Sequence, residues 1–112
     1  MKVFHLIAPE TWEAAVSAGE YAPASMQTEG FVHMSFEHQL QATANRHYGG
    51  ASELMAVVFE SSVFGDDLVV EDTSGHGEFP HVYRAISPGE ASGVVGLIRR
   101  GGAWVLGDRS GG

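Results

Sequence analysis

The stretch LMAVVF, at residues 54–59, is the longest uninterrupted apolar run in this chain of 112 residues. It contains two valines and a phenylalanine, which are residue types that favour β-strands. A strand in which every residue is apolar buries both of its faces, as a strand in the middle of a sheet does. We therefore predict that residues 54–59 form the central strand of the fold.

Other apolar or alternating segments on both sides of this run predict further strands. These segments are residues 2–8, 31–35, 68–71, 81–86, 96–100 and 103–106. The glycine pair at 101–102 separates the last two of them, which is typical of a two-residue hairpin turn. Residues 20–30 show no regular pattern, and residues 72–80 form a polar segment with two glycines and a proline, so both are predicted to be irregular.

Two helices are predicted. Residues 9–19 fit a helix because Pro9 is tolerated at the first helical position and Gly19 is a typical stop signal. The apolar face expected for this helix consists of Trp12, Ala15 and Val16. A second helix is expected over residues 36–48, with Ser35 as its cap and a glycine pair after its end. Its expected buried stripe consists of Phe36, Leu40, Ala44 and Tyr48.

The order of these elements predicts an α+β domain. Two strand–helix pairs come first and mainly strands follow, which favours a largely antiparallel sheet with two helices, and such a sheet can be split around a cleft. The length suits one domain, so we assign residues 1–107 to a single globular domain. Residues 108–112 are rich in glycine and are expected to form a flexible tail.

The composition limits which classes of partner and which cellular compartment we expect for this protein. Asp and Glu total 14 and Lys and Arg total 6, a net charge of −8, so we expect no nucleic-acid partner. The absence of cysteine excludes a disulfide scaffold, a thiolate metal cluster and a cysteine nucleophile, and it fits a reducing, cytoplasmic location. The first residues, MKVFHLIAPETW, have the pattern of neither a signal peptide nor a membrane span. The oligomeric state stays open.

Histidine is the first candidate for chemistry, because the chain has six. His5, His33 and His81 lie within or at the start of predicted strands, where an unpaired imidazole is costly to bury. Strand alternation places His33 on the same face as Ser35. Either these residues line a shared cleft, or each histidine is a structural residue that is satisfied by a backbone carbonyl.

Several familiar sites are missing from the sequence. No His-Glu-x-x-His motif is present, and the spacing of the histidines does not complete a metal site, so we expect no metal cofactor. There is no Gly-x-Ser-x-Gly elbow, no phosphate-binding loop and no dinucleotide fingerprint.

The second candidate for chemistry is a set of aromatic and polar residues. Asn45, Arg46 and Tyr48 offer an amide, a cation and a ring at one end of the second helix, and such a set can hold a planar ligand. Tyr83 adjoins Arg84, which is suited to contact a phosphate. Most of the aromatic side chains are nevertheless expected to belong to the core.

Several motifs together resemble a small bacterial family that is known only as a domain of unknown function. They are VFHLI, EGFVHMS, QLQATANRHY and GEFPHVY, and the resemblance covers residues 2–100. Members often carry cysteine after the motif histidine, where this chain has Met34, so no role essential to the family rests on that thiol.

This family in turn looks like a distant, minimal relative of the ADP-ribosyltransferase fold. The segment Phe4-His5-Leu6-Ile7 resembles the first motif of that fold, and residues 30–33 resemble the second. His81 is placed near the third motif, where the polymerases of that group have glutamate. The helix segment Thr43-Ala44-Asn45 is similar to a small-Ala-Asn run of that fold.

The resemblance implies that His5, His33 and His81 are the catalytic candidates. His5 would hydrogen-bond a ribose hydroxyl, His33 or Tyr48 would stack on a flat base or nicotinamide, and His81 would orient the ligand. The implied function is binding of a nucleotide or NAD, with a transferase or phosphotransferase activity. A non-catalytic ligand-binding module, and an interaction domain with structural histidines, are the alternatives.

Overall fold

The computed structural model describes residues 1–107, which form an α+β fold with two antiparallel sheets. The predicted α+β class, the antiparallel pairing and the splitting of the sheet are confirmed. The tail predicted at residues 108–112 lies outside the described residues. Within residues 1–107 no helix is long and apolar enough to cross a membrane.

The larger sheet has four strands in the order β1-β3-β6-β7. Their bounds are Lys2–Ile7 for β1, Met55–Glu60 for β3, Gly93–Arg100 for β6 and Ala103–Leu106 for β7. Strand β3 lies between β1 and β6, with Ala56 and Val57 fully buried, so the prediction of a central strand is confirmed. Gly101 and Gly102 have φ values of 58° and 84°, which a two-residue hairpin turn requires.

The smaller sheet has three strands in the order β2-β5-β4. Their bounds are Val32–His33 for β2, Phe79–Val82 for β5 and Leu68–Glu71 for β4. The two sheets are joined at Phe4 and Ser35, whose backbone groups exchange hydrogen bonds of 2.8 and 2.7 Å. Because pairing extends no further at this junction, the two sheets diverge beside β1.

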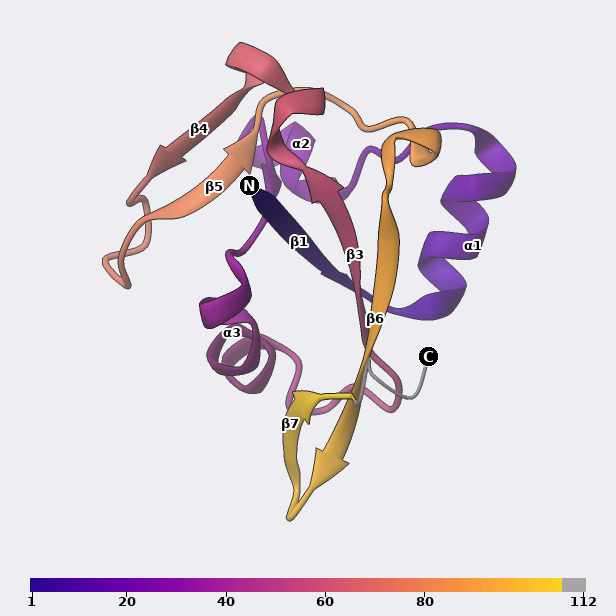
Figure 1. Cartoon of the computed structure of the whole chain (residues 1–112), viewed down its shortest axis with the longest axis vertical. Helices are drawn as coiled ribbons and strands as arrows, with labels where there is room; N and C mark the ends of the chain where they lie inside the picture. Colours follow the sequence, from indigo (N-terminus) through magenta and orange to yellow (C-terminus); the bar gives the residue numbers. More distant parts are fainter. Residues whose placement is uncertain (108–112) are drawn as a thin grey trace.

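Helices cover both faces of the larger sheet, with α1 on one side and α3 on the other (Figure 1). The helices are α1 (Pro9–Ala18), α2 (Ala24–Thr28) and α3 (Leu40–His47). Single 3₁₀ turns occur at Glu37–Gln39, Ser61–Val63, Gly65–Asp67 and Pro88–Glu90. Trp12 and Ala15 of α1 are buried in one core cluster, and Leu40 and Ala44 of α3 are buried in the other.

The ends of several elements differ from the prediction. The segment over residues 20–30 contains α2, and the strand predicted over residues 31–35 is only two residues long. Ser35 pairs with Phe4 and does not cap a helix; the Gln39 side chain instead accepts a hydrogen bond from the Phe36 backbone at 2.9 Å. A 3₁₀ turn therefore precedes α3.

Two further predictions need correction. Val16 of α1 is 54% exposed, because the apolar contacts of that helix are made by Trp12 and Ala15. The strand predicted over residues 81–86 ends at Val82. Beyond it the chain leaves the sheet, and Ile86 pairs separately with Tyr21.

Candidate functional site

A pocket of about 440 Å³ lies where the two sheets diverge, with α3 as one wall. Side chains from β1, β2, β5, α3 and the loop before β5 line it. The lining residues are His5, Leu6, His33, Met34, Ser35, Thr43, Arg46, His47, Tyr48, Thr73, Ser74, Phe79 and His81. Six of the nine predicted site residues therefore meet at one pocket: His5, His33, His81, Ser35, Arg46 and Tyr48. We refer to it below as the histidine pocket.

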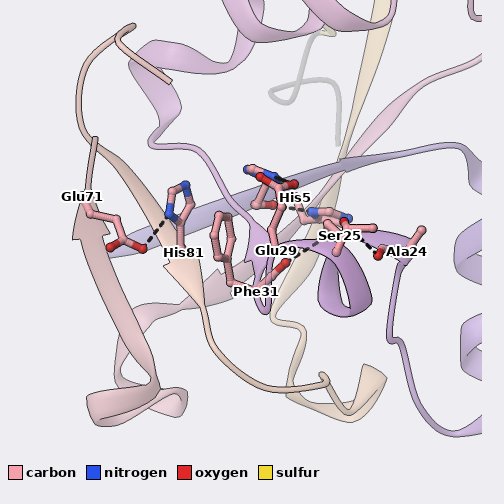
Figure 2. A network of polar contacts seen from close by, with 9 residues as sticks. His5, Ala24, Ser25, Glu29, Phe31, Glu71 and His81 are labelled. Carbon is pink, nitrogen blue, oxygen red and sulfur yellow. Dashed lines mark hydrogen bonds and ion pairs between the residues drawn. The ribbon is translucent and has the colours of Figure 1, made fainter. Parts of the chain in front are cut away.

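His33 and His81 face each other across the pairing of β2 with β5. Their ring centroids are 5.2 Å apart, with the rings nearly perpendicular. The His81 ring also stacks on Phe31, at 4.0 Å between centroids, as the neighbouring rings in Figure 2 show. His33 is half exposed and pairs with Glu29 at 2.9 Å, whereas His81 is buried. Thus the His33 ring is accessible from solvent, whereas the His81 ring is buried and held in place by its neighbours.

Glu71 anchors His81 and is itself bound by Tyr83, and neither Glu71 nor Tyr83 lines the pocket. The Glu71 carboxylate lies 2.9 Å from Nδ1 of His81 (Figure 2). The same carboxylate also accepts a hydrogen bond from the Tyr83 hydroxyl. These hydrogen bonds, first that of Tyr83 and then that of His81, hold the pKa of Glu71 below its usual value. The same carboxylate raises the pKa of Tyr83.

His5 is held by hydrogen bonds at both ring nitrogens. Nδ1 lies 2.6 Å from the backbone oxygen of His33, and Nε2 lies 2.6 Å from the hydroxyl of Tyr21. A carbonyl oxygen only accepts, so Nδ1 carries the proton and Nε2 accepts from Tyr21. Burial lowers the pKa of His5 to about 4, so the ring is neutral near pH 7, and burial also raises the pKa of Tyr21. His5 therefore has no free nitrogen for a ribose hydroxyl. Although it lines the pocket, its hydrogen bonds serve to hold β1 and β2 together.

The α3 wall carries polar groups without a protein partner. Arg46 makes no hydrogen bond or ion pair with any residue in 1–107, although it lines the pocket. The hydroxyl Oγ1 of Thr43 is buried and also has no partner within that range. A threonine in a helix has two accessible side-chain rotamers, so this hydroxyl can turn toward a bound molecule. Buried polar groups are normally satisfied, so the wall is suited to a polar ligand.

Replacing Thr43 with valine is expected to keep the free energy of unfolding unchanged or raise it by up to about 1 kcal/mol, because valine has the same shape and removes an unsatisfied hydroxyl. Urea denaturation of the wild type and Thr43→Val measures this difference. Thr43→Ser, which keeps the hydroxyl and loses a methyl group, is the matched control and should be less stable than the wild type. A clear loss of stability in Thr43→Val would contradict the assignment of a free hydroxyl.

Three predicted ligand-binding residues lie away from the pocket. Asn45 binds the edge of β7 through two hydrogen bonds with the Trp104 backbone, of 2.7 and 3.0 Å. Arg84 is occupied by ion pairs with Asp67 and Glu90, and its guanidinium lies over Phe64. Both side chains therefore make contacts that stabilise the fold, and neither lines the histidine pocket.

Tyr83, the third of these residues, does not line the pocket and is linked to it through Glu71 and through Phe31. Its hydroxyl donates to the Glu71 carboxylate, and its ring contacts Phe31 at 5.2 Å between centroids. It follows that Tyr83 can influence the site without touching a bound molecule.

Sequence reasoning missed other lining residues as well as the partners of the histidines. Thr73 and Ser74 carry no pattern that separates them from ordinary surface residues, and Thr43 stood out only through the resemblance of residues 43–45 to a run of another fold. The pairing of Glu71 with His81 follows from the register of β4 and β5, in which Val69 is opposite His81, and the register was not known. Within residues 1–107, no group of three or more His, Cys, Asp or Glu side chains is arranged to hold a metal ion.

Comparison with known proteins places the chain among proteins without an assigned activity. The profile described as "Protein of unknown function (DUF952)" matches residues 6–94. The crystal structure of protein CC0527 from Caulobacter crescentus is similar at 27% identity, with a TM-score of 0.84 and 94% of each chain covered. The solution structure of the same protein gives a TM-score of 0.80 at 27% identity, over 92% of this chain and 90% of that chain. No curated protein matches the chain.

Proposed function

We propose that this chain, which belongs to the DUF952 family of proteins of unknown function, binds a nucleotide-like ligand in the histidine pocket. The observation that carries the proposal is the meeting of His5, His33 and His81, from β1, β2 and β5, at a single hollow. These three residues are separated by long stretches of sequence, so their meeting is a property of the fold.

The chemistry of the walls supports a ligand that has a flat ring and a negative group. The exposed ring of His33 and the ring of Tyr48 are available for stacking, and Arg46 is available for an anion. A pocket of about 440 Å³ has the size of a small-molecule site. An acidic protein can bind such an anion because one unpaired guanidinium acts locally, whereas the net charge of −8 acts at long range and is screened by salt.

The proposal is tested by ligand-observed NMR with NAD, ADP-ribose and simple nucleotides. Replacing Arg46 with glutamine is expected to weaken binding of a phosphate-bearing probe about 10-fold or more, because a hydrogen bond to a charged group contributes ~1.5–3 kcal/mol. Arg100→Gln is the matched control, since Arg100 is exposed on β6 and does not line the histidine pocket. No binding of any probe to the wild type, or equal losses in the two variants, would refute the proposal.

The resemblance to ADP-ribosyltransferases suggests a transferase that uses NAD. In that case the bond between nicotinamide and the ribose of NAD would break, nicotinamide would leave with the bonding electrons, and the ribose carbon would form a bond to the oxygen of water or of an acceptor hydroxyl. His81 would take the place of the glutamate found in the polymerases. Release of nicotinamide from NAD, compared between the wild type and His81→Ala, tests this activity. Binding without turnover in either protein would favour the non-catalytic binding module.

A further inference from the structure

We infer that Glu71 and His81 form a proton-accepting pair, in which Glu71 holds the imidazole so that Nε2 takes a proton from a hydroxyl of the bound molecule. The inference rests on the proposed function, because it concerns what the histidine pocket does to a ligand. Glu71 is a positioning residue here, since it does not line the pocket, whereas His81 does.

The hydrogen bonds of Glu71 determine which nitrogen of His81 carries the proton. The Glu71 carboxylate is ionised near neutral pH, because donors hold its pKa below the usual value. An ionised carboxylate only accepts hydrogen bonds. Its contact with Nδ1 at 2.9 Å therefore requires that Nδ1 donates. In the neutral ring, Nε2 is then left with its lone pair.

The position of the His81 ring is fixed by its surroundings. Phe31 stacks on one face with an interplanar angle of 14°, and the side chain is only 3% exposed. A ring held by packing on its face and a hydrogen bond at Nδ1 keeps Nε2 in one direction. Catalytic histidines are held in the same way by a carboxylate behind the ring.

His81 differs from His5 in the use of its second nitrogen. Both nitrogens of His5 are bound by protein groups, as expected for a structural histidine. Nε2 of His81 has no partner in residues 1–107, and it is not among the fully buried unpartnered atoms of that range. Because His81 lines the histidine pocket, the open nitrogen is placed to meet a ligand.

In the proposed step, the proton moves from the hydroxyl to His81, and Glu71 compensates the charge that His81 gains. The lone pair of Nε2 takes the proton from the hydroxyl, the O–H bond breaks and its electrons stay on the oxygen. The positive charge of the imidazolium then lies beside the Glu71 carboxylate, which stabilises it. The substrate class is accordingly a nucleotide-like molecule that itself carries a hydroxyl.

The tautomer of His81 tests the positioning role directly. Two-bond ¹H–¹⁵N spectra of the ring should show the proton on Nδ1 in the wild type and a shift toward the Nε2–H form in Glu71→Met. Tyr83→Phe is the matched control, since it removes the other donor to Glu71 and leaves the His81 contact in place. An Nε2–H ring in the wild type, or the same tautomer in Glu71→Met, would overturn the inference.

The open nitrogen is tested with diethylpyrocarbonate, which acylates an unprotonated imidazole nitrogen, with each histidine followed by peptide mass spectrometry. His81 should react in the wild type and measurably more slowly in Glu71→Met, because a ring that shifts toward the Nε2–H form has no lone pair on that nitrogen. Exposed His38 is the internal reference. No labelling of wild-type His81, or equal rates in the two proteins, would contradict the inference. Neither readout needs a nucleotide, so a failure of the proposed ligand class is recognised separately.

Discussion

His5→Ala is expected to lower the free energy of unfolding by about 3–5 kcal/mol, because it leaves two buried groups unpaired and removes a buried ring. The unpaired groups are the hydroxyl of Tyr21 and the backbone oxygen of His33. Urea denaturation of the two proteins, followed by circular dichroism, measures the loss. The expected value is large because His5 connects β1 to both β2 and the segment that precedes α2.

Tyr21→Phe provides the graded comparison for this prediction. It removes one hydrogen bond of His5 and keeps the ring that packs against Trp12 and His5, so a loss of about 1–2 kcal/mol is expected. If His5→Ala were as stable as the wild type and lost only ligand binding, His5 would be a ligand-contacting residue, as the sequence first suggested. The hydrogen bonds at both nitrogens argue against that result.

Acidification is expected to destabilise the protein through the same residue. The pKa of His5 is about 4 in the folded protein, below the ordinary value of 6.5. Between these values the unfolded chain binds a proton that the folded chain does not, so stability increases with pH. The contribution of His5 is fully present above pH 6.5 and is lost as the pH falls through 4. The total loss is about 3 kcal/mol, from the size of this pKa difference.

The measurement is the free energy of unfolding as a function of pH for the wild type and for His5→Gln. Carboxylates titrate in both proteins, so the difference between the two curves isolates His5. This difference should change between pH 6.5 and pH 4 and stay constant between pH 7 and pH 8. A difference that is constant over the whole range would show that His5 keeps its ordinary titration, and the assignment of a buried neutral ring would then be wrong.

The elements that sequence reasoning predicted well are those set by local patterns. The apolar run at residues 54–59, the proline and glycine at the ends of α1, and the two glycines of the last turn each act within a few residues. The split of the sheet was also expected from the order of elements. The short β2 was predicted poorly because its extent depends on a distant partner, β5, with which Val32 and His33 pair. The sequence of α2 shows no clear helical pattern.

The candidate site shows the same division. The histidines stood out by residue type, and strand alternation placed them on defined faces. Their individual roles could not be read from the sequence, because these are decided by partners distant in the chain. The hydroxyl of Tyr21 donates a hydrogen bond to Nε2 of His5, whereas no residue of 1–107 forms a hydrogen bond with Nε2 of His81. Two histidines that look equivalent in the sequence therefore differ in their contacts, which fit a structural role for His5 and the chemical role that we propose for His81.

The same reasoning applies to the cations of the chain. From the sequence, Arg84 was the candidate for a phosphate contact, and Arg46 was a cation in a set suited to a planar ligand. Arg84 is neutralised by Asp67 and Glu90, while Arg46 has no partner in the described part of the chain and lines the histidine pocket. In an acidic protein, carboxylates are available to pair with most cationic side chains. An unpaired arginine in a pocket therefore suggests that the ligand carries a negative charge.

Titration of ¹⁵N-labelled protein with ADP-ribose, followed by two-dimensional ¹H–¹⁵N spectra, tests the nucleotide proposal most directly. Signals of His33, Thr43, Arg46 and His81 should shift together and saturate, while those of the β6–β7 turn stay unchanged, and Arg46→Gln should weaken the response. Shifts confined to the turn, or none at high concentration of the probe, would contradict the assignment of the pocket to a nucleotide-like molecule.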